Sequence, residues 1–487
     1  MKNIIKIIIG CQLLILMGCS DDFLNQPPRA SLSVGSFPTS ETDAVQATNA
    51  VYNSLRAWHI NTGGFPLLDI MSDDAEKGSN PGDGTVILAY DRFEHQPSEG
   101  SVERWYKALY EAIKRANLGI NEIPKIEMDP DLQNRLIAET RFLRAYYYSL
   151  LVRGFGDTPK VIVTDPPIDL GRTSVDEILA DIIYPDLEFA IVTLPAKSEY
   201  TSENLGRITS GAAQAFMARV KLFYGDFQAV ETLCKDVIES NEYVLVEKYG
   251  DIFPAYNEHN SESVFEISST VGSFAEGGNQ YANTQGVRGT PNRGWGFCRP
   301  TYALITEMTT SQDLRLEPTV LFLNEIIDGI TIGGEGPTPD TTYTNGQITS
   351  IECYNQKVWT PGTDTESSWS HNRRIIRYSD VLLMYAEALN ENGKTTQALP
   401  YINEIRDRAG LSFVTETNQS IVRDIIIKER KYEFALEGLR FWDLVRTGKA
   451  ESILGPLGFI ANKNELFPIP QSEIDISQGR ITQNQGY

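Results

Sequence analysis

The sequence predicts a mainly α-helical protein, built from pairs of helices and interrupted by long irregular loops. Three observations support this fold class. Apolar residues recur at helical spacing through most of the chain, and a helix–turn–helix pattern returns in separate segments. Alternating runs typical of strands are short and few, "SVFEI" at residues 263–267 being one of them. We therefore expect helices to form the core, with only a few short strands.

The chain begins with a segment typical of a secretory signal peptide. Lys2 and Lys6 precede an apolar run over residues 7–17, which is too short for the ~20 residues that span a membrane as a helix. The run ends in "LMGC", which resembles the lipobox of bacterial lipoproteins, whose cysteine is acylated after cleavage. The sequence thus predicts a signal peptide over 1–18 and a lipid anchor on Cys19. The alternative is an ordinary signal peptide that happens to contain a cysteine.

The residues after Cys19 predict where the mature protein lies. The acidic Ser20-Asp21-Asp22 resembles the surface-export flank of lipoproteins in Bacteroidetes-type bacteria, and a Pro-containing tether over 19–38 follows the anchor. We expect a protein held by lipid on the outer membrane of the cell, facing the exterior.

Residues 39–487 are expected to form one helical domain. Thr39-Ser40-Glu41 opens a helix that ends near Trp58, and two further helices, over 101–123 and from Asp129 to Arg153, are expected to form a hairpin. Two later segments resemble tetratricopeptide repeats, because small and apolar residues recur on both sides of a Gly-containing turn. They are "GAAQAFMARVKLFYGDFQAVETLCKDVIES" and "SDVLLMYAEALNENGKTTQALPYINEIRDRAG".

Two local patterns make predictions about side chains. Tyr146, Tyr147 and Tyr148 are adjacent, and neighbouring residues cannot share one helix face, so at least one ring is expected to be exposed. Arg440 and Asp443 are three residues apart on a predicted helix and are spaced to pair with each other.

The composition argues against nucleic acid as a partner and against a scaffold held by disulfides. The formal charge is −22, and loss of Lys2 and Lys6 with the signal peptide makes it −24, so the surface lacks the basic footprint of nucleic-acid binders. Without the signal peptide and the acylated cysteine, three cysteines are left, widely spaced and odd in number: Cys234, Cys298 and Cys353. They predict buried thiols, without a disulfide framework or a zinc site.

A search for reaction chemistry finds no catalytic motif, and we expect neither catalysis, nor a metal site, nor a cofactor. The four histidines are far apart and none belongs to H-E-x-x-H, and G-x-S-x-G is absent. A surface glycosidase is the alternative, since some pair among the 65 acidic residues could flank a sugar. An exposed acidic surface is the favoured explanation of these carboxylates, because some such pair is expected by chance among so many.

Sugar binding requires flat aromatic surface beside a few polar groups, and the loops supply both. A loop-rich insert is expected over about 268–372, and loops this long inside a compact domain are usually functional or disordered. The alternative for its aromatic residues is that they pin the loops to the helices. The candidate ligand-binding residues are Trp295, Tyr281, Asn279, Arg293 and Phe274 in one segment, Trp359 and Trp369 in a second, and Trp58 and Asp73 beside an earlier Gly-rich loop.

Three stretches together resemble one family. They are "ETRFLRAYYYSLLVRGFGDTP", "IIRYSDVLLMYAEALNENG" and "ERKYEFALEGLRFWDLVRTGK", the last followed by "LFPIPQSEID" and a terminal "TQNQGY". Their order and spacing look like the SusD/RagB family of outer-membrane nutrient-binding lipoproteins, over nearly the whole mature chain.

This resemblance implies about four tetratricopeptide-like helix pairs and a TonB-dependent outer-membrane transporter of the SusC type as partner. It also implies capture of oligosaccharide or polysaccharide for that transporter. Some relatives take peptides instead, so a peptide ligand is one alternative. A purely structural protein that docks the transporter and binds no ligand is another.

Overall fold

The computed structural model describes residues 37–167, 169–272, 277–336, 339–360 and 370–487. Helices dominate it, as predicted. The α-helices are α3 (Glu41–Arg56), α4 (Leu67–Ile70), α5 (Thr85–Asp91), α6 (Gly100–Glu122), α7 (Pro130–Phe155), α8 (Val175–Ile178), α9 (Tyr184–Thr193), α10 (Ser210–Phe223), α11 (Phe227–Glu239), α12 (Tyr281–Gln285), α13 (Tyr302–Ser311), α14 (Leu316–Thr319), α15 (Tyr378–Glu391), α16 (Thr395–Arg408), α17 (Gln419–Glu433), α18 (Arg440–Arg446), α19 (Ala450–Leu454) and α20 (Gln471–Ile476).

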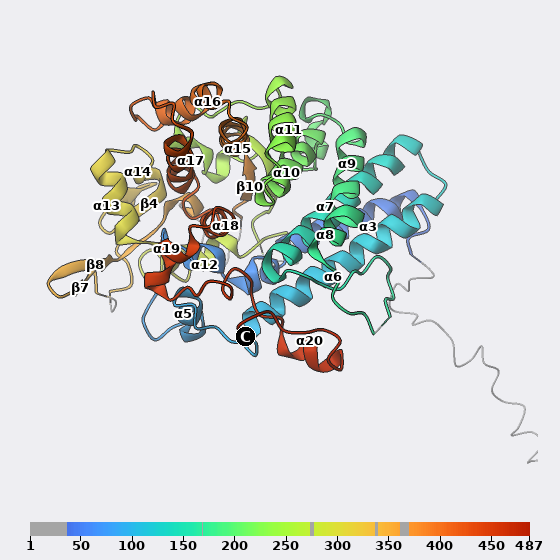
Figure 1. Cartoon of the computed structure of the whole chain (residues 1–487), viewed down its shortest axis with the longest axis horizontal. Helices are drawn as coiled ribbons and strands as arrows, with labels where there is room; N and C mark the ends of the chain where they lie inside the picture. The colour runs from blue at the N-terminus through green and yellow to red at the C-terminus, as the bar shows by residue number, and fades with distance from the viewer. Residues whose placement is uncertain (1–36, 168, 273–276, 337–338, 361–369) are drawn as a thin grey trace, which may run out of the picture.

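The strands are short and form two-stranded antiparallel sheets. They are β1 (Ala75–Gly78), β2 (Ser263–Ile267), β3 (Phe297–Pro300), β4 (Val320–Phe322), β5 (Ile326–Ile327), β6 (Ile330–Thr331), β7 (Thr341–Thr344), β8 (Gln347–Ile351), β9 (Cys353–Asn355) and β10 (Arg373–Arg377). The pairs are β1 with β3, β2 with β10, β4 with β9, β5 with β6 and β7 with β8. In Figure 1 the β7–β8 hairpin projects from the edge of the molecule.

Helix starts follow local capping chemistry. The hydroxyl of Ser40 accepts the N–H of Asp43, and the Asp43 carboxylate accepts the N–H of Ser40, which completes a capping box for α3. Asp129 caps α7 by accepting the N–H of Leu132 at 2.8 Å, and Pro130 occupies the first helical position, where no N–H is needed. Both starts agree with the sequence-based prediction.

Paired helices build the body of the protein. The most extensive contacts join α6 with α7, α10 with α11 and α15 with α16, and further contacts join α11 with α15 and α7 with α9. In Figure 1, α3, α6, α7, α8 and α9 lie on one side, α13 and α14 on the other, and α10, α11 and α15 between them. Each pair therefore covers the apolar side of the next, as in a helical repeat.

The prediction of an exposed tyrosine on α7 is wrong. Tyr146, Tyr147 and Tyr148 are at most 4% exposed, because α3, α6 and α9 all pack against α7 and cover several faces of it. Two of the buried hydroxyls find backbone acceptors: Tyr147 donates to Val51 and Tyr148 to Val161, each at 2.8 Å. A helix enclosed by neighbours can bury adjacent rings.

The prediction that Arg440 pairs with Asp443 is also wrong. Arg440 instead binds Asp73, at 2.6 and 3.0 Å, while Asp443 accepts from Arg430 and Arg446. Tertiary contacts outcompete the pairing within the helix, because they offer bidentate geometry in a buried setting.

A buried ionic network ties the C-terminal helices to β2 and β10. The guanidinium of Arg377 is 1% exposed and lies 2.6 Å from Glu262, 2.8 Å from Glu433 and 2.9 Å from Glu437. Arg408 binds Glu262 and Glu433 from α16, at 2.6 and 2.7 Å. The network joins elements that lie far apart in the sequence.

The cysteine prediction is confirmed: Cys234, Cys298 and Cys353 are free and buried. Within the described ranges, none of the helices combines the length and apolar character that crossing a membrane requires. Cys19 and most of the predicted tether lie outside the described residues, so the lipid anchor stays a prediction.

Candidate ligand-binding site

The pairing of β1 with β3 brings together two loops that the sequence separates by more than 200 residues. Gly78 lies opposite Phe297 in the register, and the N–H of Ser79 donates to the carbonyl of Gly296 at 2.7 Å. The segment before β1 carries Trp58, and the segment before β3 carries Trp295. Two of the three candidate regions therefore meet in space.

These loops form an aromatic cluster, defined here as Trp58, Phe65, Trp295 and Phe297. The rings of Trp58 and Trp295 meet edge to face, with centroids 5.8 Å apart and planes at 85°. Phe65 lies 5.6 Å from Trp58 and 5.2 Å from Phe297. Phe297 is buried, while the other three rings are partly exposed. Phe297 thus anchors the cluster and the two tryptophans reach its surface.

The backbone beside Trp58 depends on a glycine. Gly64 has φ +110°, and a Cβ at this position would lie 2.6 Å from the indole ring of Trp58. A side chain there would push the ring aside, and positive φ is costly for other residues. Gly64 therefore sets where Trp58 lies.

A small pocket adjoins the cluster; we call it the aromatic-end pocket. It has a volume of about 20 Å³, enough for roughly one water or hydroxyl group. Trp58 and Asn61 line it, and the indole N–H of Trp58 and the side-chain nitrogen of Asn61 are buried without hydrogen-bond partners among the described residues. Buried donors normally have acceptors, so these two favour an oxygen-rich ligand or a bound water.

Tyr281 and Asn279 also line this pocket. The Arg373 guanidinium lies 4.9 Å from the centre of the Tyr281 ring, and the Tyr281 hydroxyl donates to the carbonyl of Leu436 at 3.4 Å. The side-chain oxygen of Asn279 accepts the N–H of Tyr281, and its nitrogen donates to the carbonyl of His371. Asn279 is 5% exposed, so it positions Tyr281 and the strand that carries Arg373.

Asp69, which interacts electrostatically with Tyr281, and Asp74 are two buried carboxyl groups. Burial raises the pKa of Asp69 to about 8, with a further contribution from Asp74, while the N–H of Gly438 lowers it. Burial and then the charge of Asp73 raise the pKa of Asp74 to about 6. Burial therefore outweighs the groups that favour ionisation of these carboxyls.

Asp73 itself is held by cations. Arg440 binds it in bidentate fashion, and Lys431 lies 3.0 Å away. Burial opposes ionisation, but the hydrogen bond and charge of Arg440 outweigh it and lower the pKa of Asp73. These contacts connect the loop before β1 to α17 and α18; a ligand contact by Asp73 stays a prediction.

Trp359 forms contacts of a different kind. Its indole N–H donates to Asp328 at 2.7 Å, and the Arg293 guanidinium lies 5.8 Å from its ring centre. Arg293, from the Trp295 segment, thus reaches the second candidate region. Phe274 and Trp369 lie outside the described residues, and their assignment stays a prediction.

Sequence reasoning missed Phe65, Asn61 and Arg373. The first two lie in or beside the Gly-rich loop that follows Trp58, where an aromatic and an amide beside glycines were a usable signal. No sequence signal pointed to Arg373, because only the pairing of β10 with β2 brings it to Tyr281. In the part of the chain that is described, no group of three or more His, Cys, Asp or Glu side chains is placed to hold a metal.

Comparisons with known proteins agree with this architecture. A family model described as "SusD family" matches residues 328–458, and one described as "Starch-binding associating with outer membrane" matches residues 65–222. "SusD-like protein P25" of Formosa agariphila is 28% identical, with 97% of both chains covered. "Starch-binding protein SusD" of Bacteroides thetaiotaomicron is 25% identical over 80% of this chain and 79% of the relative.

Solved structures show the same fold. A "Laminarin binding SusD-like protein" superposes with a TM-score of 0.79 and 28% identity, covering 92% of this chain and all of that one. "Surface glycan-binding protein A" from Bacteroides thetaiotaomicron in complex with laminarihexaose gives a TM-score of 0.75 at 26% identity, with the same coverage.

Proposed function

Because the chain belongs to the SusD/RagB family, we propose that it captures oligosaccharide or polysaccharide at the cell surface and delivers it to a TonB-dependent transporter of the SusC type. The protein is not an enzyme, since the family binds glycans without catalysis. The ligand-binding face proposed here is the aromatic cluster with the aromatic-end pocket beside it.

One observation carries the proposal: Trp58 and Trp295, distant in sequence, meet with ring centroids 5.8 Å apart at the surface of the same loop assembly. An aromatic face matches the apolar C–H face of a pyranose ring. The donors of Trp58 and Asn61, which have no hydrogen-bond partner in the described part of the chain, suit the hydroxyl oxygens that such a ring presents. Two similar solved structures, a laminarin-binding protein and a complex with laminarihexaose, support a glucan as the first ligand to test.

The attachment to the membrane is the second part of the proposal. Acylation of Cys19 would hold the protein stably at the outer membrane, with residues 19–38 as a tether and the acidic segment favouring the exterior face. Replacing Cys19 with Ala is expected to move the protein from the membrane fraction to the soluble fraction. Unchanged membrane attachment of Cys19→Ala would contradict the anchor, and failure to co-purify with a SusC-type transporter would contradict the delivery role.

Binding is tested with single Trp58→Ala and Trp295→Ala variants. Each substitution is expected to raise the dissociation constant for the glycan about two- to tenfold, because about 0.5 to 1.5 kcal/mol of aromatic contact is lost. Affinity electrophoresis against laminarin, starch and other neutral polysaccharides, followed by calorimetry, measures this. Tyr343→Ala is the matched control, because this ring is 62% exposed on the projecting β7–β8 hairpin.

The outcomes separate the proposal from its rivals. If both tryptophan variants bind as tightly as the wild type, the site lies elsewhere, and the Trp359 region becomes the next candidate. If only peptides bind, the protein is a peptide-capturing member of the family. If nothing binds but the transporter co-purifies, the role is structural.

A further inference from the structure

We propose that the protein binds a chloride ion in a pocket between α7 and α10, beside the guanidinium of Arg153. The site is separate from the proposed ligand-binding face, since no residue of the aromatic cluster or of the aromatic-end pocket lines it. Three observations carry the inference: the pocket itself, a cation without an acceptor, and a neighbouring ion network that is already balanced.

Two helix faces form the pocket, called here the α7–α10 pocket. Ser149, Val152 and Arg153 line it from α7, at spacings of three and four residues that place them on one side of that helix. The side of α10 that faces them, with its C-terminal end, contributes Phe216, Arg219, Val220, Phe223 and Tyr224. The volume is about 20 Å³, which is room for one water molecule or one monoatomic anion.

Arg153 lacks an acceptor for its N–H groups. In the described part of the chain its side chain makes no hydrogen bond and no ion pair, and its Nε is buried. Its guanidinium lies 4.8 Å from the ring centre of Trp442, whose indole N–H is likewise buried without a partner among the described residues. The ring attracts the cation but supplies no negative charge to balance it. Two unsatisfied donors therefore lie side by side without an acceptor.

The neighbouring ion network cannot balance the charge of Arg153, because it is already neutral. Three arginines and three carboxylates alternate along this network, with contacts between 2.7 and 3.0 Å. In order they are Arg219, Asp380, Arg430, Asp443, Arg446 and Glu387. Asp443 is near enough to interact with the charge of Arg153, but Arg430 and Arg446 already bind it. Arg153 is therefore a fourth cation beside three matched charges.

The environment makes this extra charge costly. Burial, and then the charge of Arg219, lower the pKa of Arg153 to about 10, so the guanidinium is still charged at neutral pH. A charge removed from water is stabilised by an opposite charge beside it, and the attraction is stronger than in water because the local dielectric constant is low. No carboxylate of the described residues lines the pocket, so solution is the source of the anion.

Three side chains of the pocket can donate to an anion. Besides Arg153, Arg219 binds Asp380 through Nε and Nη2, and its Nη1 makes no hydrogen bond among the residues that the structure describes. Burial raises the pKa of Tyr224, so its hydroxyl stays protonated and can donate as well. The small volume favours chloride over sulfate or a carboxylate, whose several oxygens need more space.

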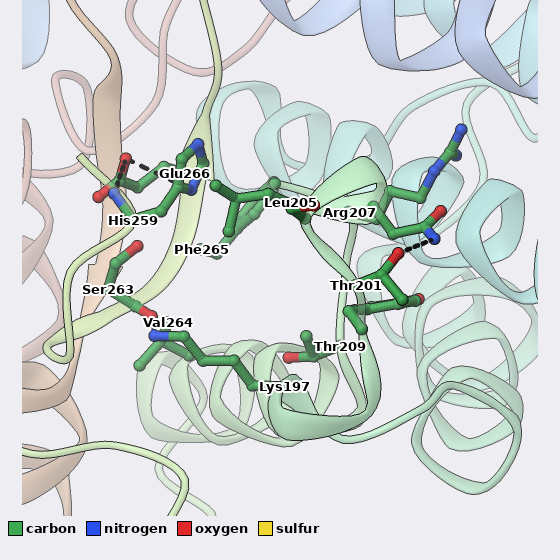
Figure 2. A pocket seen from close by; sticks show the side chains of 14 residues that line it. Lys197, Thr201, Leu205, Arg207, Thr209, His259, Ser263, Val264, Phe265 and Glu266 are labelled. Carbon is green, nitrogen blue, oxygen red and sulfur yellow. Dashed lines mark hydrogen bonds and ion pairs between the residues drawn. The ribbon is translucent and has the colours of Figure 1, made fainter.

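The larger pocket in Figure 2, of about 120 Å³, shows the ordinary arrangement. There the Lys197 ammonium donates to two backbone carbonyls, at 2.8 and 2.9 Å, and Arg207 binds Glu139 at 2.7 Å. Both of these cations have acceptors within the protein. Arg153 has none in the described part of the chain, and for this reason the anion is assigned to the smaller pocket.

The experiment measures the melting temperature of the full mature protein at pH 7 while sodium chloride replaces sodium methanesulfonate at constant ionic strength. Methanesulfonate is too large for the α7–α10 pocket. The melting temperature of the wild type is expected to rise by roughly 1 to 3 °C along a saturable curve, as for an ion about ten- to a hundredfold above its dissociation constant. A general salt effect would not saturate in this way.

Three variants test whether the rise depends on Arg153. Arg153→Met removes the charge and keeps an unbranched side chain against Trp442, and its melting temperature is expected to be independent of chloride. Arg153→Lys keeps the charge and is expected to retain part of the rise. Arg480→Met is the matched control, since Arg480 is exposed, and it is expected to show the full rise of the wild type.

Crystals grown in sodium bromide locate the ion directly, because bromide scatters X-rays anomalously. An anomalous peak is expected between Arg153 and Tyr224 in the wild type, and no peak is expected there in Arg153→Met. If Arg153→Met does not fold, the presence or absence of the wild-type peak decides the question.

The proposal is overturned if chloride stabilises Arg153→Met as much as the wild type, or if bromide gives no peak in the pocket. If acetate or sulfate produces a larger Arg153-dependent rise than chloride, the assignment to chloride is wrong. Glycan binding is measured separately with the tryptophan variants, so each proposal can fail without the other.

Discussion

Two regions bury carboxyl groups and treat them in opposite ways. In the helical core, Asp380 on α15 lies between Arg219 and Arg430, at 2.5 and 2.7 Å, and is 1% exposed. Burial opposes its ionisation, but the two arginines outweigh it and lower the pKa to about 2. Near the ligand-binding site, Asp69 and Asp74 are equally buried and their pKa values are raised.

The difference lies in which elements surround each carboxyl. Two neighbouring helices bring arginines to Asp380, Arg219 from α10 and Arg430 from α17, and α16 brings Arg408 to Glu433. Among the described residues, the carboxylate of Asp69, on the short α4, receives only the backbone N–H of Gly438 as a hydrogen-bond donor, and the charge of Asp74 further raises its pKa. The two arginines thus stabilise the charge of Asp380, whereas burial, with no cation of the described chain in hydrogen-bond contact, keeps Asp69 and Asp74 protonated over part of the pH range.

The largest effect is expected from breaking the core pair. Asp380→Ala leaves two buried guanidinium groups without their carboxylate and is expected to lower the free energy of unfolding by about 3 to 5 kcal/mol. Denaturant titration at pH 7 measures this, with Asp380→Asn as the volume-matched comparison. A loss below about 1 kcal/mol would show that solvent reaches these arginines.

The pH dependence of the core pair has a defined sign. The pKa of Asp380 is lowered in the folded state, so its contribution to stability is present above about pH 4 and is lost as the pH falls towards about 2. In Asp380→Asn the stability curve is expected to be flatter over this window. An unchanged slope would contradict the assigned pKa shift.

Asp69 is expected to behave in the opposite way, with a smaller effect. Its folded pKa is raised, so its contribution is present below about pH 4 and is lost as the pH rises towards about 8. Asp69→Asn keeps an acceptor for the N–H of Gly438 and is expected to be more stable than the wild type at pH 8, by at least about 1 kcal/mol. Equal stability at pH 8 would mean that Asp69 ionises freely.

The smallest effect is expected at the surface. Lys107 and Glu103 pair at four-residue spacing on α6, with side chains 48% and 32% exposed. Lys107→Ala is expected to cost about 0.3 to 0.5 kcal/mol, and the cost should shrink in high salt. A loss as large as that of Asp380→Ala would remove the contrast between exposed and buried charge.

Much of the fold was predictable because it depends on local chemistry. The capping residues Ser40 and Asp129 and the glycine turns between helices fixed helix starts and hairpins from sequence. The tyrosine run on α7 was misjudged for a tertiary reason, since several helices cover α7 at once. Arg440 was misjudged likewise, because Asp73 reaches it from a loop 367 residues away.

Sequence alone determined the helical class, the candidate aromatic residues and the acidic character of the chain, because spacing and composition express them directly. It could not determine that Trp58 meets Trp295, since only the β1–β3 pairing brings them together. Nor could it reveal that the Arg373 guanidinium lies 4.9 Å from the centre of the Tyr281 ring, which depends on the pairing of β10 with β2. Residue types are local properties, whereas a binding site is made by surfaces that become neighbours only when the chain folds.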